Sequence, residues 1–76
     1  KLSVLTVEVN DAANPGIVSI VTSLIAKQGI SIRQTISEDP EFTDDPKLYI
    51  ITDEQLPGEL VNELISLDFV KKIGIE

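Results

Sequence analysis

The sequence has no cysteine and no histidine among its 76 residues. Disulfides, thiolate and imidazole metal ligands, and most familiar pairs of nucleophile and base are therefore excluded. Aromatic residues make up only 4% of the chain, too few for a platform on which nucleic-acid bases could stack. Acid–base chemistry would have to rest on carboxylates and the single arginine. We therefore expect no catalytic residues, no metal and no cofactor.

Basic residues are scarce as well. Six lysines and arginines stand against thirteen acidic residues, which gives a formal net charge of −7. Such a chain repels phosphate backbones, so contact with nucleic acid is not expected. Its apolar runs are too short to span a bilayer, and the N-terminus lacks the pattern of a signal peptide. These features predict a soluble, cytoplasmic domain without membrane contact.

The length allows one domain. A chain of this size buries only about 60% of the surface that its unfolded form exposes, so its core is marginal. A homodimer or higher oligomer is therefore expected to supply further burial. The chain begins at Lys1 and contains no methionine, so we expect residues 1–76 to be a single domain forming the C-terminal part of a longer protein.

The apolar residues follow the periods of strands and helices in a definite order. Strands are predicted, from β-branched residues and alternation, for the stretches 2–9, 30–37, 47–52 and 69–76. Apolar residues at helical spacing predict a helix over 17–28, and Pro57 opens a second one. The order β-α-β-β-α-β predicts an α+β fold of the ferredoxin-like type, a four-stranded antiparallel sheet with both helices on one face.

The same periods predict which side chains face inward. Alternation over 30–37 places on the apolar side Ile30, Ile32, Gln34 and Ile36, and on the other side Ser31, Arg33, Thr35 and Ser37. The inner stripe of the first helix is predicted to be Ile17, Ile20, Val21, Leu24 and Ile25. The inner stripe of the second helix is predicted to be Leu60, Val61, Leu64 and Ile65.

The segment NDAANPG, residues 10–16, joins the first strand to the first helix. Asn14 can cap the helix, Pro15 suits its first position, and Gly16 lets a ligand approach closely. Backbone N–H groups at a helix N-terminus favour an anion such as an α-carboxylate, while Asp11 or the side chains of Asn10 and Asn14 could receive an α-amino group. The alternative is that the segment only starts a helix.

Together with residues 17–32, this segment resembles the ACT domain family. The resemblance rests on NDAANPGIVSIVTSLIAKQGISI and extends over residues 2–76. In that family a strand ends in a polar residue, a short loop leads to Pro-Gly, a β-branched helix comes next, and a glycine precedes the second strand. The corresponding positions here are Asn10 or Asp11, Pro15-Gly16, the helix over 17–28, and Gly29.

The resemblance implies an amino-acid-sensing regulatory domain that pairs with a second copy and binds an L-amino acid at the seam. Its implied effector-binding residues are Asn10, Asp11, Ala12, Ala13, Asn14, Pro15, Gly16, Ile17, Ile30, Ser31 and Ile32. In many relatives the residues from the second strand come from the partner subunit. An alternative within the same fold is a domain that serves oligomerisation only and binds no ligand.

A narrower resemblance involves GISIRQTISEDPEFTDDPKLYIIT and PGELVNELISLDFVKKI. These stretches are similar to archaeal ACT proteins described as predicted regulators of homoserine dehydrogenase, some with an N-terminal part like a helix-turn-helix. This resemblance implies that a biosynthetic enzyme or a DNA-binding region, in the same full-length chain or associated with it, is the regulated partner. Any such region would lie outside these 76 residues.

Two charged features leave alternatives open. The loop predicted over 38–46 has five acidic residues, which could ligate Ca²⁺ or Mg²⁺ but lack the spacing of an EF-hand, so a solvated loop is the other interpretation. Arg33 could hold a ligand carboxylate or an acid of a partner, or it could pair across strands. Lys71 and Lys72 are predicted to guard an edge strand against unwanted pairing.

Overall fold

Four strands form one antiparallel sheet. β1 (Ser3–Val9) lies between β3 (Lys47–Thr52) and β4 (Val70–Ile75), and β2 (Ile32–Ser37) pairs with the outer side of β3. The strand order is therefore β2-β3-β1-β4, and β2 and β4 are the two edges. The computed structural model describes residues 2–10 and 16–76. Each observed strand falls within the range predicted from the sequence.

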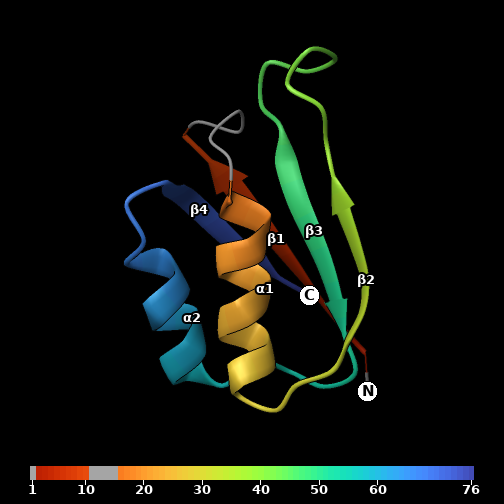
Figure 1. The fold of residues 1–76 in the computed structure, drawn as a ribbon, viewed down its shortest axis with the longest axis vertical. Coiled ribbons are helices and arrows are strands. Elements are labelled where there is room, and N and C mark those ends of the chain that lie inside the picture. Colours follow the sequence, from red (N-terminus) through yellow and green to blue (C-terminus); the bar gives the residue numbers. More distant parts are fainter. Residues whose placement is uncertain (1, 11–15) are drawn as a thin grey trace.

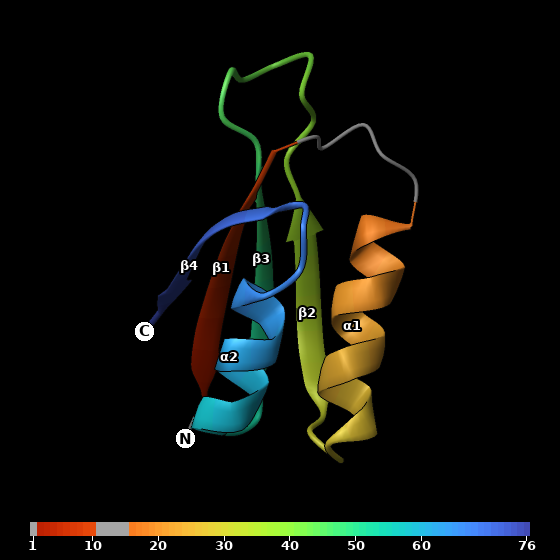
Figure 2. The same ribbon diagram turned by 90° about the vertical axis from the view of Figure 1, so that its left-hand side faces the viewer.

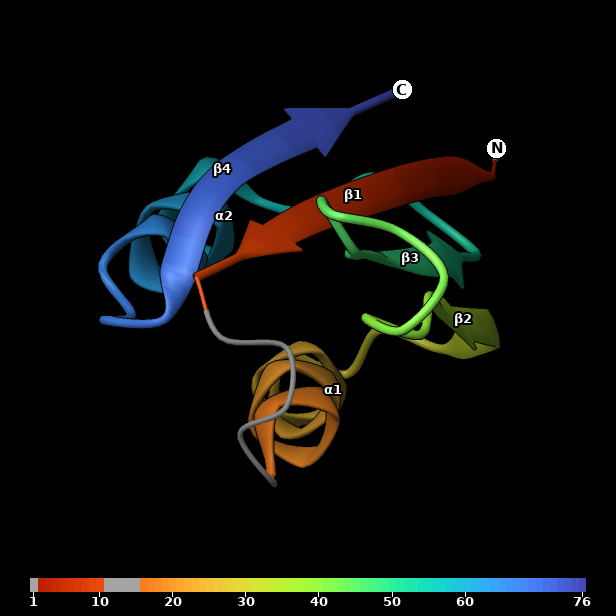
Figure 3. The same cartoon turned by 90° about the horizontal axis from the view of Figure 1, so that it is seen from above.

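Two helices complete the fold. α1 (Ile17–Lys27) and α2 (Gly58–Ile65) lie on the same face of the sheet (Figure 1), as the view from above also shows (Figure 3). This arrangement confirms the predicted ferredoxin-like α+β fold. Among the described residues, no helix is long and apolar enough to cross a membrane.

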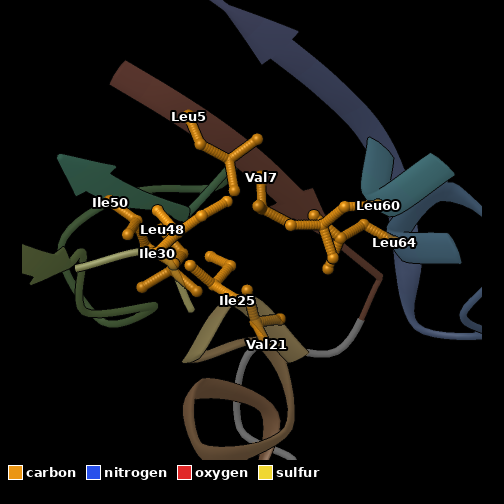
Figure 4. Packing of buried hydrophobic residues seen from close by; sticks show 9 residues of the cluster. All are labelled: Leu5, Val7, Val21, Ile25, Ile30, Leu48, Ile50, Leu60 and Leu64. Carbon is orange, nitrogen blue, oxygen red and sulfur yellow. The ribbon is translucent and has the colours of Figure 1, made fainter. Parts of the chain in front are cut away.

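The core lies between the two central strands and the helices. Leu5 and Val7 of β1 lie opposite Ile50 and Leu48 of β3, and all four side chains are buried. From the helices, Val21, Ile25, Leu60 and Leu64 close the cluster (Figure 4). Complete burial of such an aliphatic side chain contributes about 1.5–3 kcal/mol of transfer free energy. Alternation in the strands and the i, i+4 spacing in the helices therefore create one shared core.

The prediction that two further helix residues lie in the core is wrong. Ile20 of α1 is 44% exposed and Ile65 of α2 is 54% exposed. Each is adjacent in sequence to a buried residue of its helix, Val21 and Leu64 respectively. Successive residues of an α-helix are about 100° apart, so such a neighbour points to the flank of the helix when the contact with the sheet is narrow. Val18 is also exposed, so α1 carries apolar surface outside the core.

Glycines set both ends of α1. Gly16 occupies the N-cap with φ of 92°, and its carbonyl accepts the first helical hydrogen bond, from the N–H of Ile20 at 2.9 Å. At the other end Gly29 has φ of 78° and its N–H donates to the Ala26 carbonyl, which confirms the predicted stop. Asn14 and Pro15, the predicted cap and first helical residue, lie outside the described residues, and the helix begins at Ile17.

β2 departs from the predicted alternation. Ile32 lies opposite Thr52 while Gln34 lies opposite Ile51, so Arg33 is an extra residue in a β-bulge. Beyond the bulge, Thr35 and Ser37 lie opposite the buried Ile50 and Leu48 on the helix-covered side. Gln34 and Ile36 therefore face the open side of the sheet, and their predicted orientation toward the helices is wrong. One inserted residue reverses every later side chain of a strand.

Candidate functional site

One group of predicted site residues lies at the end of the sheet where β1 finishes. Asn10 is exposed, its N–H donates to the Phe69 carbonyl at 2.8 Å, and its Nδ2 approaches the Asp68 carbonyl at 3.4 Å. These contacts tie the end of β1 to the segment that leads into β4. The predicted residues Asp11, Ala12, Ala13, Asn14 and Pro15 lie outside the described residues.

The same end of the molecule holds the N-terminus of α1 (Figure 2). Gly16 is exposed, and a Cβ at this position would meet no heavy atom within 4 Å. An α-helix leaves its first N–H groups without intrahelical partners, and the first turn of α1 contains no acidic residue that would neutralise its positive end. Ile17 is buried in the core at 5% exposure, so its side chain is not accessible to a ligand.

The second group lies at the opposite end. Ile30 is buried, Ser31 is exposed with its carbonyl accepting the Asp53 N–H at 3.1 Å, and Ile32 is half-buried at the start of β2. Figure 1 shows the start of β2 near the last turn of α1. The length of the helix therefore separates the start of β2 from the first turn of α1. With eleven residues, α1 is about 16 Å long. The described residues of the predicted site are therefore divided between two opposite ends of the molecule.

A charged cluster lies beside the end of β1. Asp45 Oδ2 is 3.6 Å from Lys47 Nζ, and Lys47 lies opposite Glu8 in the sheet. Hydrogen bonding with Glu8 lowers the pKa of the Asp45 carboxyl; burial opposes this effect, and Lys47 and Lys71 reinforce it. Burial acts against the charge of Lys47, but the Asp45 and Glu8 carboxylates outweigh it and raise the pKa of that ammonium. The cluster therefore keeps opposite charges fixed near neutral pH.

The acidic loop 38–46 is internally hydrogen bonded. Asp39 Oδ1 accepts the Glu41 N–H and Glu38 Oε1 accepts the Lys47 N–H, both at 2.9 Å. Within the described part of the chain, no three acidic side chains gather in a way that could hold a metal ion. Phe42, near the middle of this loop, is 86% exposed. Phe42 is not among the site residues predicted from the sequence, although an aromatic residue in an acidic loop is a recognisable signal.

Arg33 pairs within its own chain. Its Nη1 lies 3.0 Å from Asp53 Oδ1, and the two side chains are 60% and 44% exposed. Of the alternatives left open for Arg33, the structure therefore shows an ion pair with Asp53, which directly follows the adjacent strand β3. Such an exposed pair contributes roughly 0–1 kcal/mol.

β2 is an edge strand, at the position expected for two copies that pair through their second strands. The Glu38 N–H donates to the Lys47 carbonyl at 3.0 Å, next to the pair Ser37–Leu48. Antiparallel pairs alternate between hydrogen-bonded and non-hydrogen-bonded, so the backbone groups of Ser37 and Thr35 point away from β3. Their outward direction depends on the register with β3, which the sequence of β2 alone does not contain.

No family model matches the sequence, and no curated protein matches it. Solved structures with the same fold do exist. Escherichia coli aspartokinase III in complex with lysine and aspartate is similar with a TM-score of 0.75 and 17% identity, over 99% of this chain and 16% of that one. The ligand-free regulatory subunit of aspartate kinase from Thermus thermophilus gives a TM-score of 0.71 and 16% identity, over 99% of this chain and 49% of that one.

The chain shares their fold. It spans only part of each of these two proteins. A third similar structure, the CheA P2 domain of Thermotoga maritima in complex with CheY, has a TM-score of 0.70 and 12% identity, over 100% of this chain and 95% of that one. One fold thus occurs in an aspartokinase, in a regulatory subunit of aspartate kinase and in a domain solved in complex with another protein, so function has to be argued from the site.

Proposed function

We propose that this chain is an ACT-type regulatory domain that binds an L-amino acid between two copies and transmits its occupancy to a biosynthetic enzyme or DNA-binding region. The main support for this proposal is that the described residues of the predicted site lie at opposite ends of the molecule. Gly16 and the start of β2 are separated by the length of α1, so one copy cannot surround a small ligand with both groups (Figure 1).

Antiparallel pairing of two β2 edges would join the two groups. In such a pair the start of one β2 lies beside the end of the other, and the end of β2 is at the same side of the molecule as the first turn of α1 (Figure 1). The outward backbone groups of Thr35 and Ser37 are available for this pairing. Val18 and Ile20 are both exposed on α1, and because they are about 200° apart around the helix, only one of them can lie on the flank nearer the seam. Two equivalent sites would form across the seam.

A ligand that contacts both copies binds the paired state more tightly than the separated one. Its binding therefore shifts the equilibrium toward the pair, by no more than this difference in affinity. The helix N-terminus at Gly16 suits the α-carboxylate, and Asp11 is the proposed partner of the α-amino group. The narrower proposal, regulation of a homoserine dehydrogenase, comes from the sequence resemblance. A solved homoserine dehydrogenase from Thiobacillus denitrificans supports it by having the same fold, with a TM-score of 0.70 and 20% identity over 97% of this chain and 16% of that one.

A thermal-shift screen against the twenty L-amino acids, with D-enantiomers as controls, tests the proposal. A ligand that binds only the folded state stabilises it by about 2.7 kcal/mol at one hundred times its Kd. We expect a stereospecific rise in melting temperature that Asp11→Ala removes. Thr35→Pro should also remove it, because proline lacks the outward N–H, whereas Thr35→Ala should keep both pairing and the shift.

The outcomes separate the candidate functions. No shift with any amino acid in a chain that still pairs through β2 would refute sensing and favour the domain that serves oligomerisation only. A shift that persists in the monomeric Thr35→Pro variant would refute a shared site. Gly16 is not suitable for this test, because its φ of 92° makes any side chain there strain the backbone.

A further inference from the structure

The face of the sheet opposite the helices is not covered by any described part of the chain (Figure 3). Its centre is formed by half-buried residues of β1 and β3, with the exposed Ile36 of β2 beside them. The central residues are Val4, Thr6, Tyr49 and Ile51. This face, here called the open face, is therefore apolar in the middle.

A row of charges crosses one end of the open face. Glu8 of β1 lies opposite Lys47 on one side and Lys72 on the other. Glu38 comes directly after β2 and donates its N–H to the Lys47 carbonyl, while its Oε1 accepts the Lys47 N–H, so its carboxylate ends the row beside β3. Across the sheet, in the order β2-β3-β1-β4, the signs are negative, positive, negative, positive.

The next row along the strands is graded by size. Ile36 lies opposite Tyr49, Tyr49 opposite Thr6, and Thr6 opposite Gly74. Large side chains occupy the half made by β2 and β3, and small ones the half made by β1 and β4. Gly74 has room above it, since an added Cβ would make only an ordinary contact of 3.8 Å with Thr6 Cβ.

We propose that the open face binds the open face of a second copy, related by a two-fold axis that runs parallel to the strands between β1 and β3. This rotation places β1 over the partner's β3 and β2 over the partner's β4. A two-fold interface must be complementary to itself, and both rows meet that condition. Stacked sheets lie about 10 Å apart with strand directions within about 30° of each other.

The charge row becomes complementary under this rotation. Glu8 faces the partner's Lys47, and Glu38 faces the partner's Lys72. An alternating row over an even number of strands reverses into its opposite, so no two like charges among these four residues meet. The Asp45 carboxylate stays 3.6 Å from Lys47 Nζ of its own copy. A two-fold axis across the strands would instead place the charge row over Val4 and Ile51 at the other end of the sheet, where its charges would lose water without gaining partners.

The size row gives the same answer independently. Tyr49 lies over the partner's Thr6, and Ile36 lies over the space above the partner's Gly74. Large residues thus meet small ones at every position of the row, as dense packing requires. The proposal does not depend on amino-acid binding, because the open face and the β2 edge are different surfaces. If both pairings form, the assembly does not close at four copies, because the axis at the β2 edge and the axis between β1 and β3 do not intersect.

Charge reversal with mixing tests the interface by sedimentation equilibrium. Glu8→Lys alone places a second positive charge opposite the partner's Lys47, and Lys47→Glu alone places a second negative charge opposite the partner's Glu8. We expect each variant to associate at least tenfold more weakly than the wild-type chain. An equimolar mixture should restore association to near the wild-type level, because both contacts across the mixed pair are then between opposite charges.

Matched controls carry the same charge changes on the helices. Glu63→Lys and Lys27→Glu alter exposed residues of α2 and α1 and should leave open-face association within about threefold of wild type.

A second pair of variants tests the packing of large side chains on small ones and leaves the charged residues unchanged. Gly74→Val should weaken association by filling the space that receives Ile36, and mixing with Ile36→Ala should recover part of it. Circular dichroism of each variant verifies that it is folded.

Three outcomes would overturn the proposal. The first is a wild-type chain that stays monomeric at all concentrations up to about 1 mM, since the affinity would then be weaker than about 4 kcal/mol. The second is an association that persists in the Glu8→Lys and Lys47→Glu variants but is lost in Thr35→Pro. That result would assign the association to the β2 edge. The third is folded single variants whose mixture does not recover association. The amino-acid screen gives its own result in each case.

Discussion

Gly16 shows how one residue connects conformation to the candidate site. Its φ of 92° lies in the left-handed region, and an added Cβ would meet nothing within 4 Å, so a substitution acts only through the backbone. We expect Gly16→Ala to lower the free energy of unfolding by about 1–2 kcal/mol. Gly58→Ala, also without steric contact but at ordinary φ, should be neutral or stabilise by up to about 1 kcal/mol. Urea denaturation of both variants measures the difference, and equal losses would contradict it.

Asp45 gives a pH prediction at the same scale. Because hydrogen bonding with Glu8 lowers its pKa below the ordinary value of 3.8, the unfolded chain binds more protons than the folded one in this window. The contribution of Asp45 to stability is present above pH 3.8 and is lost as the pH falls through the lower folded pKa. We expect the urea midpoints of wild type and Asp45→Asn to differ at neutral pH and to converge in acid. Asp44→Asn is the control, since Asp44 forms no ion pair within the described part of the chain. A gap that does not change with pH would refute the role of Asp45.

At the scale of an element, α1 presents one face to the core and another outward. Ile25 is fully buried, whereas Ile20 is 44% exposed on the same helix. We expect Ile25→Ala to lower the free energy of unfolding by about 2–5 kcal/mol, through lost burial and a residual cavity, and Ile20→Ala by less than about 1 kcal/mol. Both substitutions remove the same atoms, so denaturation at a concentration where the chain is monomeric compares burial alone. Similar losses would show that Ile20 also belongs to the core.

The elements also show what the sequence could predict. The order of strands and helices was predictable, because alternation and helical spacing are local patterns. The faces of β2 were not, because the bulge at Arg33 is defined only by pairing with Thr52 and Ile51 of β3. The division of the candidate site, by contrast, follows from the helix predicted over 17–28. Its length separates the residues that precede it from those that follow it.

At the scale of the whole molecule, net charge opposes every proposed pairing. Each copy carries −7, and the structure measures 32 × 21 × 19 Å. At about 10 mM salt the Debye length is roughly 30 Å, so charges across the entire molecule act together, whereas at about 150 mM it is roughly 8 Å and only close pairs matter. Long-range repulsion therefore dominates at low salt, and the contacts in an interface decide at physiological salt.

The expected result is an association that strengthens several-fold when salt rises from about 10 to about 150 mM, measured by sedimentation equilibrium. Glu63→Lys, which makes the chain two charges less negative on an exposed part of α2, should reduce this salt dependence without changing the interfaces. Association that weakens over the same range would instead mean that the opposite charges in the row of Glu8 and Lys47 outweigh the repulsion between whole molecules. In that case the Glu8→Lys variant should lose the salt dependence, whereas repulsion between net charges would leave most of it in place.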